Sequence, residues 1–136
     1  MKIHSLICLL LIVCLDTFSA NRFVVFEKES NAFSLVSDNK IINILIDKGI
    51  HIAAENLCED FSQVFGMKPQ LTTEISDENC IIVGSLNSKY IKQLIQKEKF
   101  EKKQLQGKNE KYIITTVDAP FNGVKKALVI AGSDRR

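Results

Sequence analysis

The sequence has 136 residues, of which 46% are hydrophobic and 25% charged, and its formal net charge is +2 at pH 7. This length is enough for one domain with a core, and the composition argues against a disordered tail and a polytopic membrane protein. Lysine and glutamate are interleaved along the chain, as in residues 98–103, and no one-signed basic stripe with aromatic residues is present. Nucleic-acid binding is therefore not expected.

The first twenty residues have the pattern of a signal peptide. A basic start at Lys2 precedes an apolar stretch, residues 5–15, that is too short to span a bilayer comfortably as a helix. Cleavage after Ser19 fits the small residues that follow slightly better than cleavage after Ala20. Cys14 lies in the outline of a lipoprotein signal, but the bulky residue before it argues against a lipid anchor. We expect residues 1–20 to be removed and the protein to be exported to the periplasm, the cell surface or the medium, without stable membrane insertion.

Removal of the leader leaves two cysteines, Cys58 and Cys80, in residues 21–136. An oxidising compartment could join them. However, Cys58 lies on the apolar side of an expected helix and Cys80 opens an apolar strand, so the sequence favours two buried thiols over a disulfide. His51 has no cysteine or histidine partner at metal-ligand spacing and is interpreted as a partly exposed polar residue. Neither a metal nor a cofactor is expected.

Residues 21–136 are predicted to form one domain in which strands and helices alternate. From Ile50 to Phe65 the apolar residues recur at helical spacing, and Gly66 and Pro69 end this helix. Acidic residues fall on the polar side of the same helix and are expected to face solvent: Glu55, Glu59 and Asp60. Three strands are expected before it, at residues 23–28, 33–36 and 41–46.

The second half of the chain repeats this plan. Residues 80–83 are a continuous apolar run, which is typical of a strand buried on both faces of a sheet. A helix that begins at Asn87 or Ser88 and runs through Lys97 follows. The other strands are expected at residues 71–75, 112–117 and 127–131. The turn at residues 118–123 is too short for a parallel crossover, so the last two strands are predicted to be antiparallel. The fold class is therefore α/β, with a mixed sheet and helices packed on it.

Two buried strands run into a Gly-Ser pair, at Gly84-Ser85 and at Gly132-Ser133. Glycine permits a close approach of backbone or ligand, and the free N–H groups of a following helix favour an anion or a sugar hydroxyl, so a binding crevice is one interpretation. No longer glycine-rich loop accompanies either pair. The favoured interpretation is that both are ordinary capped turns between strand and helix.

The sequence resembles the amino-terminal domain of glycoside hydrolase family 115, the xylan α-1,2-glucuronidases. The last fourteen residues, GVKKALVIAGSDRR from Gly123 to Arg136, are the most specific part of the resemblance, which covers nearly all of residues 21–136. Further matching stretches are residues 33–36, 41–47, 65–69 and the strand that ends at residues 83–85. In that family this α/β domain resembles the small domain that precedes the barrel in hexosaminidases and other α-glucuronidases. The resemblance implies that a helix and a catalytic (β/α)₈ barrel follow Arg136.

The resemblance also implies a reaction that needs groups outside this sequence. Family members release glucuronic or 4-O-methylglucuronic acid from xylan with inversion, which requires a carboxylic acid and a carboxylate roughly 6.5–9.5 Å apart. Those groups belong to the barrel, so no catalytic residue is assigned here. The expected function is that of the non-catalytic front domain of an exported glycosidase, inactive alone, whose partners are the missing barrel and, through the whole enzyme, xylan. The alternative is a stand-alone exported module that binds carbohydrate or protein.

Three residues at the end of the chain are candidates for binding or interdomain contact: Ser133, Asp134 and Arg135. An arginine here could pair with a carboxylate in a bidentate manner, whereas a helix cap with an interdomain ion pair is the favoured interpretation. A final strand without a following helix would leave apolar surface uncovered. We therefore expect the chain alone to be weakly stable or to self-associate.

Overall fold

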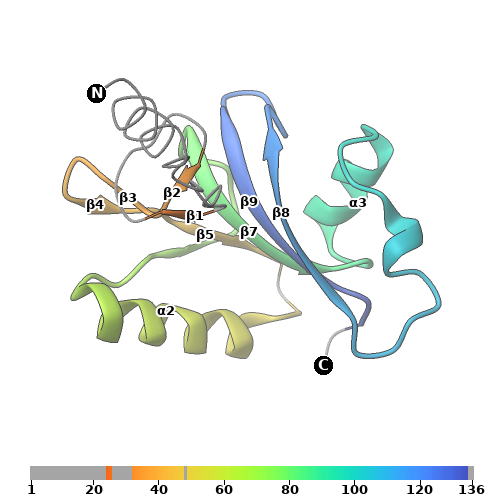
Figure 1. Cartoon of the computed structure of the whole chain (residues 1–136), viewed down its shortest axis with the longest axis horizontal. Coiled ribbons are helices and arrows are strands. Elements are labelled where there is room, and N and C mark those ends of the chain that lie inside the picture. The colour runs from red at the N-terminus through yellow and green to blue at the C-terminus, as the bar shows by residue number, and fades with distance from the viewer. Residues whose placement is uncertain (1–23, 26–31, 48, 135–136) are drawn as a thin grey trace, which may run out of the picture.

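A computed structural model describes residues 24–25, 32–47 and 49–134 and has a five-stranded sheet at its centre, in the order β6-β5-β7-β9-β8 (Figure 1). Strands β5, β6, β7 and β9 are parallel, and β8 runs antiparallel to β9. The strands are β5 (Ile44–Ile46), β6 (Leu71–Thr72), β7 (Asn79–Ser85), β8 (Tyr112–Asp118) and β9 (Lys126–Gly132). The expected α/β class with a mixed sheet is confirmed, as is the antiparallel pairing across residues 118–123.

Two helices cover opposite faces of this sheet: α2 (His51–Phe65) and α3 (Lys89–Gln96). Helix α2 ends as its sequence predicts, because Gly66 adopts a left-handed conformation at φ 67° and its N–H donates to the carbonyl of Ser62 at 3.0 Å. A short 3₁₀ helix, η1 (Lys102–Gln104), lies between α3 and β8. The connection between α3 and β8 thus contains one regular turn.

A second structural unit precedes β5 and is built from very short strands. Strand β1 (Val24–Val25) pairs in parallel with β2 (Phe33–Ser34), and β3 (Val36–Ser37) pairs with β4 (Lys40–Ile41) in a hairpin. The two residues of the hairpin turn have positive φ, 51° and 60°, as a primed two-residue turn requires. The strands expected at 33–36 and 41–46 are each divided in two, with breaks at Leu35 and at residues 42–43. The division arises because residues 36–37 and 40–41 pair with each other in the hairpin, whereas residues 44–46 pair with β7 of the central sheet. Of the strand expected at 23–28, only residues 24–25 are described.

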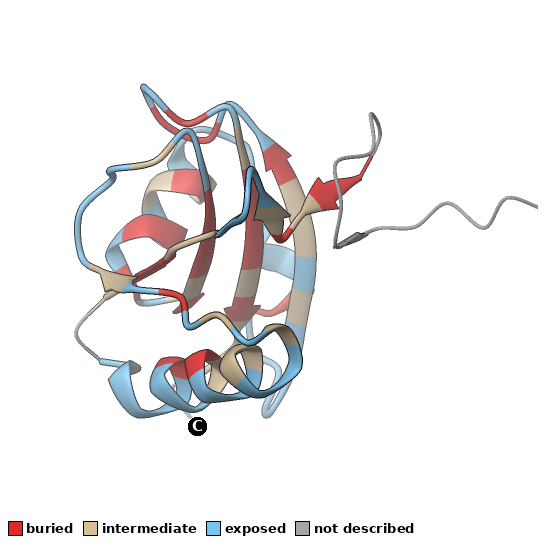
Figure 2. Ribbon diagram, turned by 90° about the vertical axis from the view of Figure 1, so that its left-hand side faces the viewer, coloured by how far each residue is buried: buried red, intermediate tan, exposed pale blue. Residues whose placement is uncertain are grey.

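The sheet separates two hydrophobic clusters (Figure 2). The cluster on the α3 side contains Cys80, and the cluster on the α2 side contains Cys58, so the sheet lies between the two sulfurs. Both cysteines are buried and free, which confirms the expectation of two thiols. Central strand β7 is buried on both faces, as its apolar run predicted. Within the described residues no helix is both long and apolar enough to cross a membrane.

Smaller differences from the expected elements concern strand ends. Strand β6 has two residues instead of the five expected at 71–75, and residues 73–78 then lead to β7. Gly84 and Ser85 belong to β7 itself instead of following it. The expected leader, residues 1–20, lies outside the described residues.

Candidate functional site

The two Gly-Ser pairs lie side by side at the carboxyl edge of the sheet, where the parallel strands end. Gly84 pairs with Ala131 and Ser85 with Gly132 in the register of β7 and β9. A further bond ties the strands together beyond the ladder, because the N–H of Leu86 donates to the carbonyl of Gly132 at 3.1 Å. The fold thus brings together the two segments that sequence analysis singled out.

The first Gly-Ser pair, Gly84-Ser85, packs against the start of helix α3. The N–H of Ser85 donates to the Ser88 hydroxyl at 2.9 Å, and both side chains are buried. A side chain at Gly84 would place its Cβ 2.8 Å from Cγ1 of Ile91, so glycine is needed for the close approach of α3. The first N–H of α3, that of Lys89, donates to the Asp47 carboxylate at 3.1 Å. A carboxylate of this chain therefore already occupies the place where an anion would bind at this helix end.

The second pair is held by hydrogen bonds to Lys111, the residue just before β8. The N–H of Ser133 donates to the carbonyl of Lys111 at 2.8 Å, and the N–H of Lys111 donates to the Ser133 hydroxyl at 3.2 Å. Asp134 is half-buried and has its own contacts, whereas Arg135 lies outside the described residues. In both Gly-Ser turns, the polar groups named above are thus engaged by hydrogen bonds within this chain.

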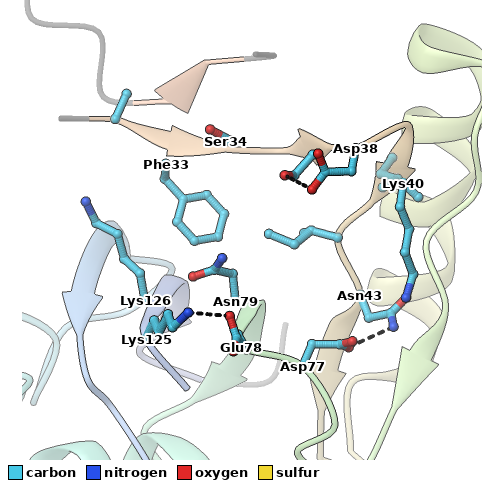
Figure 3. A pocket seen from close by; sticks show the side chains of 14 residues that line it. Phe33, Ser34, Asp38, Lys40, Asn43, Asp77, Glu78, Asn79, Lys125 and Lys126 are labelled. Atoms are coloured by element: carbon cyan, nitrogen blue, oxygen red, sulfur yellow. Dashed lines mark hydrogen bonds and ion pairs between the residues drawn. The ribbon is translucent and has the colours of Figure 1, made fainter. Parts of the chain in front are cut away.

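A cavity of about 460 Å³ lies at the opposite, amino edge of the sheet (Figure 3). It opens between the β2–β4 segment and the first residues of β7 and β9. The Phe33 ring and the Asn79 amide point toward one another across it in Figure 3. Its charged lining residues are Asp38, Lys40, Asp77, Glu78, Lys125 and Lys126.

Most charges of this cavity are paired. Lys125 Nζ lies 2.6 Å from Glu78 Oε2, and Asn43 Nδ2 donates to Asp77 Oδ2 at 2.8 Å. Among the described residues, neither the Lys40 ammonium nor the Asn79 side-chain amide has an ion-pair or hydrogen-bond partner. Positive and negative side chains balance, so the cavity is suited to a neutral polar ligand that accepts and donates hydrogen bonds. Sequence analysis missed it because its residues come from three separate segments with no shared motif.

The remaining candidate residues on α2 lie where the helical pattern predicted. His51 is exposed, with its Nδ1 3.3 Å from Glu55 Oε1, and Glu59 forms an ion pair with Lys68. Glu55, Glu59 and Asp60 are all exposed, as expected. The hydrogen bond to Glu59 raises the pKa of Lys68.

The two thiols are poor nucleophiles. Burial raises the pKa of Cys80 to about 11, and the nearby Asp77 carboxylate adds to this shift. Burial also raises the pKa of Cys58. The thiolate is the reactive form of cysteine, so neither side chain is prepared for covalent catalysis.

Comparison with models of protein families and with curated protein sequences finds no match to this chain.

Proposed function

We propose that this chain is the non-catalytic amino-terminal domain of an exported glycoside hydrolase that removes glucuronic or 4-O-methylglucuronic acid from xylan. The observation that carries the proposal is the resemblance of residues 123–136 to family 115. Within this stretch, Lys126–Gly132 form β9, which lies next to the central strand β7 and ends at the carboxyl edge of the sheet. A mixed α/β sheet is also the fold that the resemblance implies for this domain.

The chemistry of the proposed reaction is assigned to the barrel that the resemblance implies. The three acidic residues of α2 considered above lie on its exposed face, and one of them is paired with a lysine. Inverting hydrolysis needs one protonated and one ionised carboxyl group on either side of a sugar. The proposed role of this domain is therefore to pack against and stabilise the barrel.

The test is a glucuronidase assay on two proteins: the 136-residue chain, and the protein encoded when the natural reading frame is followed past Arg136. Both are incubated with glucuronoxylan, and released uronic acid is quantified by chromatography. We expect release by the longer protein and none by the 136-residue chain. Hydrolysis by the shorter chain, or a longer protein that carries no barrel and releases no uronic acid, would contradict the proposal.

The second candidate is a stand-alone module that binds a neutral oligosaccharide in the amino-edge cavity. The cavity volume and the unpaired Asn79 amide favour it. Titration of the 136-residue chain with xylo-oligosaccharides, followed by NMR, would detect it. Asn79→Ala should abolish shifts around the cavity, whereas the control Asn122→Ala, at an exposed turn residue, should not.

A further inference from the structure

The two edges of the central sheet differ in how much backbone they offer to another strand. Among the described residues, β6 forms one edge and β8 the other (Figure 1). Strand β6 has only two residues, which gives an incoming strand little to pair with. Strand β8 has seven residues and is paired with β9 along its whole length. A long edge strand presents a row of backbone N–H and C=O groups that a further strand can bind.

The hydrogen bonds at the two ends of β8 show which of its backbone groups point outward. The N–H of Ser133 donates to the carbonyl of Lys111 at 2.8 Å, and the N–H of Ala119 donates to the carbonyl of Lys125 at 2.8 Å. In an antiparallel ladder, residues bonded to the partner strand alternate with residues whose N–H and C=O point away from it. The odd-numbered residues from 111 to 119 are therefore bonded toward β9. The even-numbered residues 112–118 direct their backbone groups away from the sheet.

This outward row is open to pairing within the part of the chain that the structure describes. The Thr115 hydroxyl donates to the carbonyl of Thr116 at 3.4 Å, and a carbonyl oxygen has a second lone pair for another donor. Strand β8 contains neither proline nor lysine, which commonly protect edge strands. Its sequence, YIITTVD, consists of β-branched and aromatic residues up to its last position. The edge thus has both the backbone groups and the side chains of a strand that pairs.

The backbone conformation at both ends sets the length that can pair. Glu110 and Ala119 have positive φ, 54° and 46°, which does not continue an extended strand. Pro120 follows and has no N–H to donate. The pairing segment is therefore β8 itself, with four outward-directed residues.

A second copy of β8 is complementary to this segment in one register. A two-fold axis perpendicular to the sheet makes the two strands antiparallel and keeps each side chain on the same face. With Thr115 on this axis, residues 112 and 114 lie opposite residues 118 and 116 of the second copy. All four outward residues of each copy then form reciprocal backbone hydrogen bonds. A shift by two residues, the smallest that keeps the faces matched, leaves one outward residue of each copy opposite a residue beyond the strand.

The side chains are compatible with the same register. Ile114, which is 48% exposed, lies opposite Thr116 of the second copy and diagonal to its Ile114. The charged residue of the strand, Asp118, is opposite Tyr112 of the second copy, whose next residue is Lys111. The two Asp118 carboxylates are at opposite ends of the pair, six residues or about 20 Å apart. No like charges therefore meet across this pair of strands.

We propose that two copies of this chain associate through β8, antiparallel and with Thr115 on the two-fold axis, so that their five-stranded sheets form one continuous sheet. The two-residue β6 at each outer edge ends the assembly at a dimer, because it offers no comparable edge to a third copy. The contact consists mainly of one strand from each copy, so the dimer should be weak. This association does not depend on the proposed role in a glycosidase.

Cysteine cross-linking of the 136-residue chain tests the register. In a non-hydrogen-bonded antiparallel pair the Cα atoms lie about 4.5 Å apart, which a disulfide can span. Thr115→Cys creates such a pair on the axis, so mild oxidation should give a covalent dimer. Ile113→Cys is the matched control, since it lies on the same face of β8 but about 13 Å along the strand from its counterpart. Peptide mass spectrometry distinguishes these links from any that involve the buried Cys58 and Cys80.

Sedimentation of Thr116→Pro tests the backbone bonds. The N–H of Thr116 points away from β9, so proline removes a donor from the outer edge and none from the β8–β9 ladder. Each dimer loses two hydrogen bonds, and we expect the association constant to fall by about tenfold or more. Thr116→Lys is a second variant that places a charge on the edge without constraining the backbone. Thr73→Lys, at an exposed residue beside β6, is the control and should leave association unchanged. Circular dichroism verifies that each variant is folded.

Several outcomes would overturn the inference. A chain that sediments as a monomer at all concentrations would exclude the dimer. Cross-linking that is absent at position 115, or equally efficient at position 113, would exclude the register. Association that persists in both Thr116 variants would assign the contact to another surface, and assemblies larger than a dimer would show that it does not close. A dimer that links at position 115 and is weakened by both Thr116 variants, but not by Thr73→Lys, would support it.

Discussion

Replacement of Gly84 by alanine should destabilise the protein by about 1–2 kcal/mol, although alanine is the better residue for an ordinary strand position. Two effects of opposite sign decide the result. Alanine reduces the conformational freedom of the unfolded chain, which stabilises the folded state by about 0.5–1 kcal/mol. Against this, the new Cβ would lie 2.8 Å from Cγ1 of Ile91 and 3.0 Å from Cβ of Ser88.

The steric effect is larger because neither neighbour can move away easily. Carbon atoms in contact normally lie about 3.5–4.0 Å apart, so the new methyl group is too close to Ile91 by roughly 1 Å. Ile91 is fully buried and β-branched, and a helix restricts such a side chain to one main rotamer. Helix α3 must shift instead, and overpacking of this kind costs about 1–3 kcal/mol. Because the new methyl group would be too close to two buried neighbours, we take the upper part of this range, about 2–3 kcal/mol, and subtraction of an entropic gain of up to about 1 kcal/mol leaves about 1–2 kcal/mol.

Urea unfolding followed by circular dichroism measures this difference, and for a domain of this size it corresponds to a melting temperature lower by about 4–8 °C. A double-mutant cycle with Ile91→Ala isolates the contact, since that change removes the atom nearest to the new methyl group. In the Ile91→Ala background, Gly84→Ala should cost clearly less, because only the contacts with Ser88 remain. If Gly84→Ala instead stabilised the otherwise unchanged protein, the assignment of this glycine to close helix packing would be wrong.

Three further predictions concern titration, capping and association. The pKa of Cys80 is raised from 9.0 to about 11, so the unfolded state loses its thiol proton at lower pH than the folded state does. The free energy of unfolding should therefore fall by about 2–3 kcal/mol between pH 9 and pH 11. Urea titrations at both pH values measure this change, and Cys80→Ala should make the free energy of unfolding less dependent on pH. Asp47→Ala removes the carboxylate bonded to the first N–H of α3 and should cost about 1 kcal/mol in the same assay, whereas Asp60→Ala, at an exposed site on α2, should cost little. The 136-residue chain should associate weakly in sedimentation experiments, and Ile114→Lys should weaken that association; a monomer at all concentrations would contradict this.

The sheet core could be predicted from sequence because local patterns and tertiary contacts agree there. Residues 80–83 are apolar without interruption, and β7 is indeed the central strand. The α2 stripe and its stop at Gly66 are equally local signals. The short connection at residues 118–123 fixes the antiparallel β8–β9 pair, because chain length alone excludes a crossover.

The β3–β4 hairpin could not be read from hydrophobic pattern. Its two-residue turn consists of Asp38 and Asn39, which adopt a left-handed backbone conformation more readily than other non-glycine residues, but the turn lacks the glycine that marks such hairpins most strongly. The isoleucine-rich stretch after the turn, residues 41–46, has the pattern of one continuous strand, and only tertiary pairing decides that Ile41 belongs to β4 while Ile44 begins β5. The amino-edge cavity escaped sequence analysis for a related reason. Residues 40, 79 and 125 are distant in sequence, and no single segment signals their approach.

The two Gly-Ser pairs show how identical local sequences can have different structural roles at one edge of a sheet. Gly84 is followed by α3, and the missing Cβ permits that helix to lie against β7. Gly132 is followed by a turn that Ser133 ties to β8, and the described residues place no helix on the α2 side of β9. Four apolar residues pair in register across the sheet on this side: Ile46, Val83, Ile130 and Ile114. Helix α2 covers only the end of this row at Ile46, so Ile46 is buried whereas Ile114 is exposed. The two pairs therefore differ in what their glycine and serine contact, although their own sequences are the same.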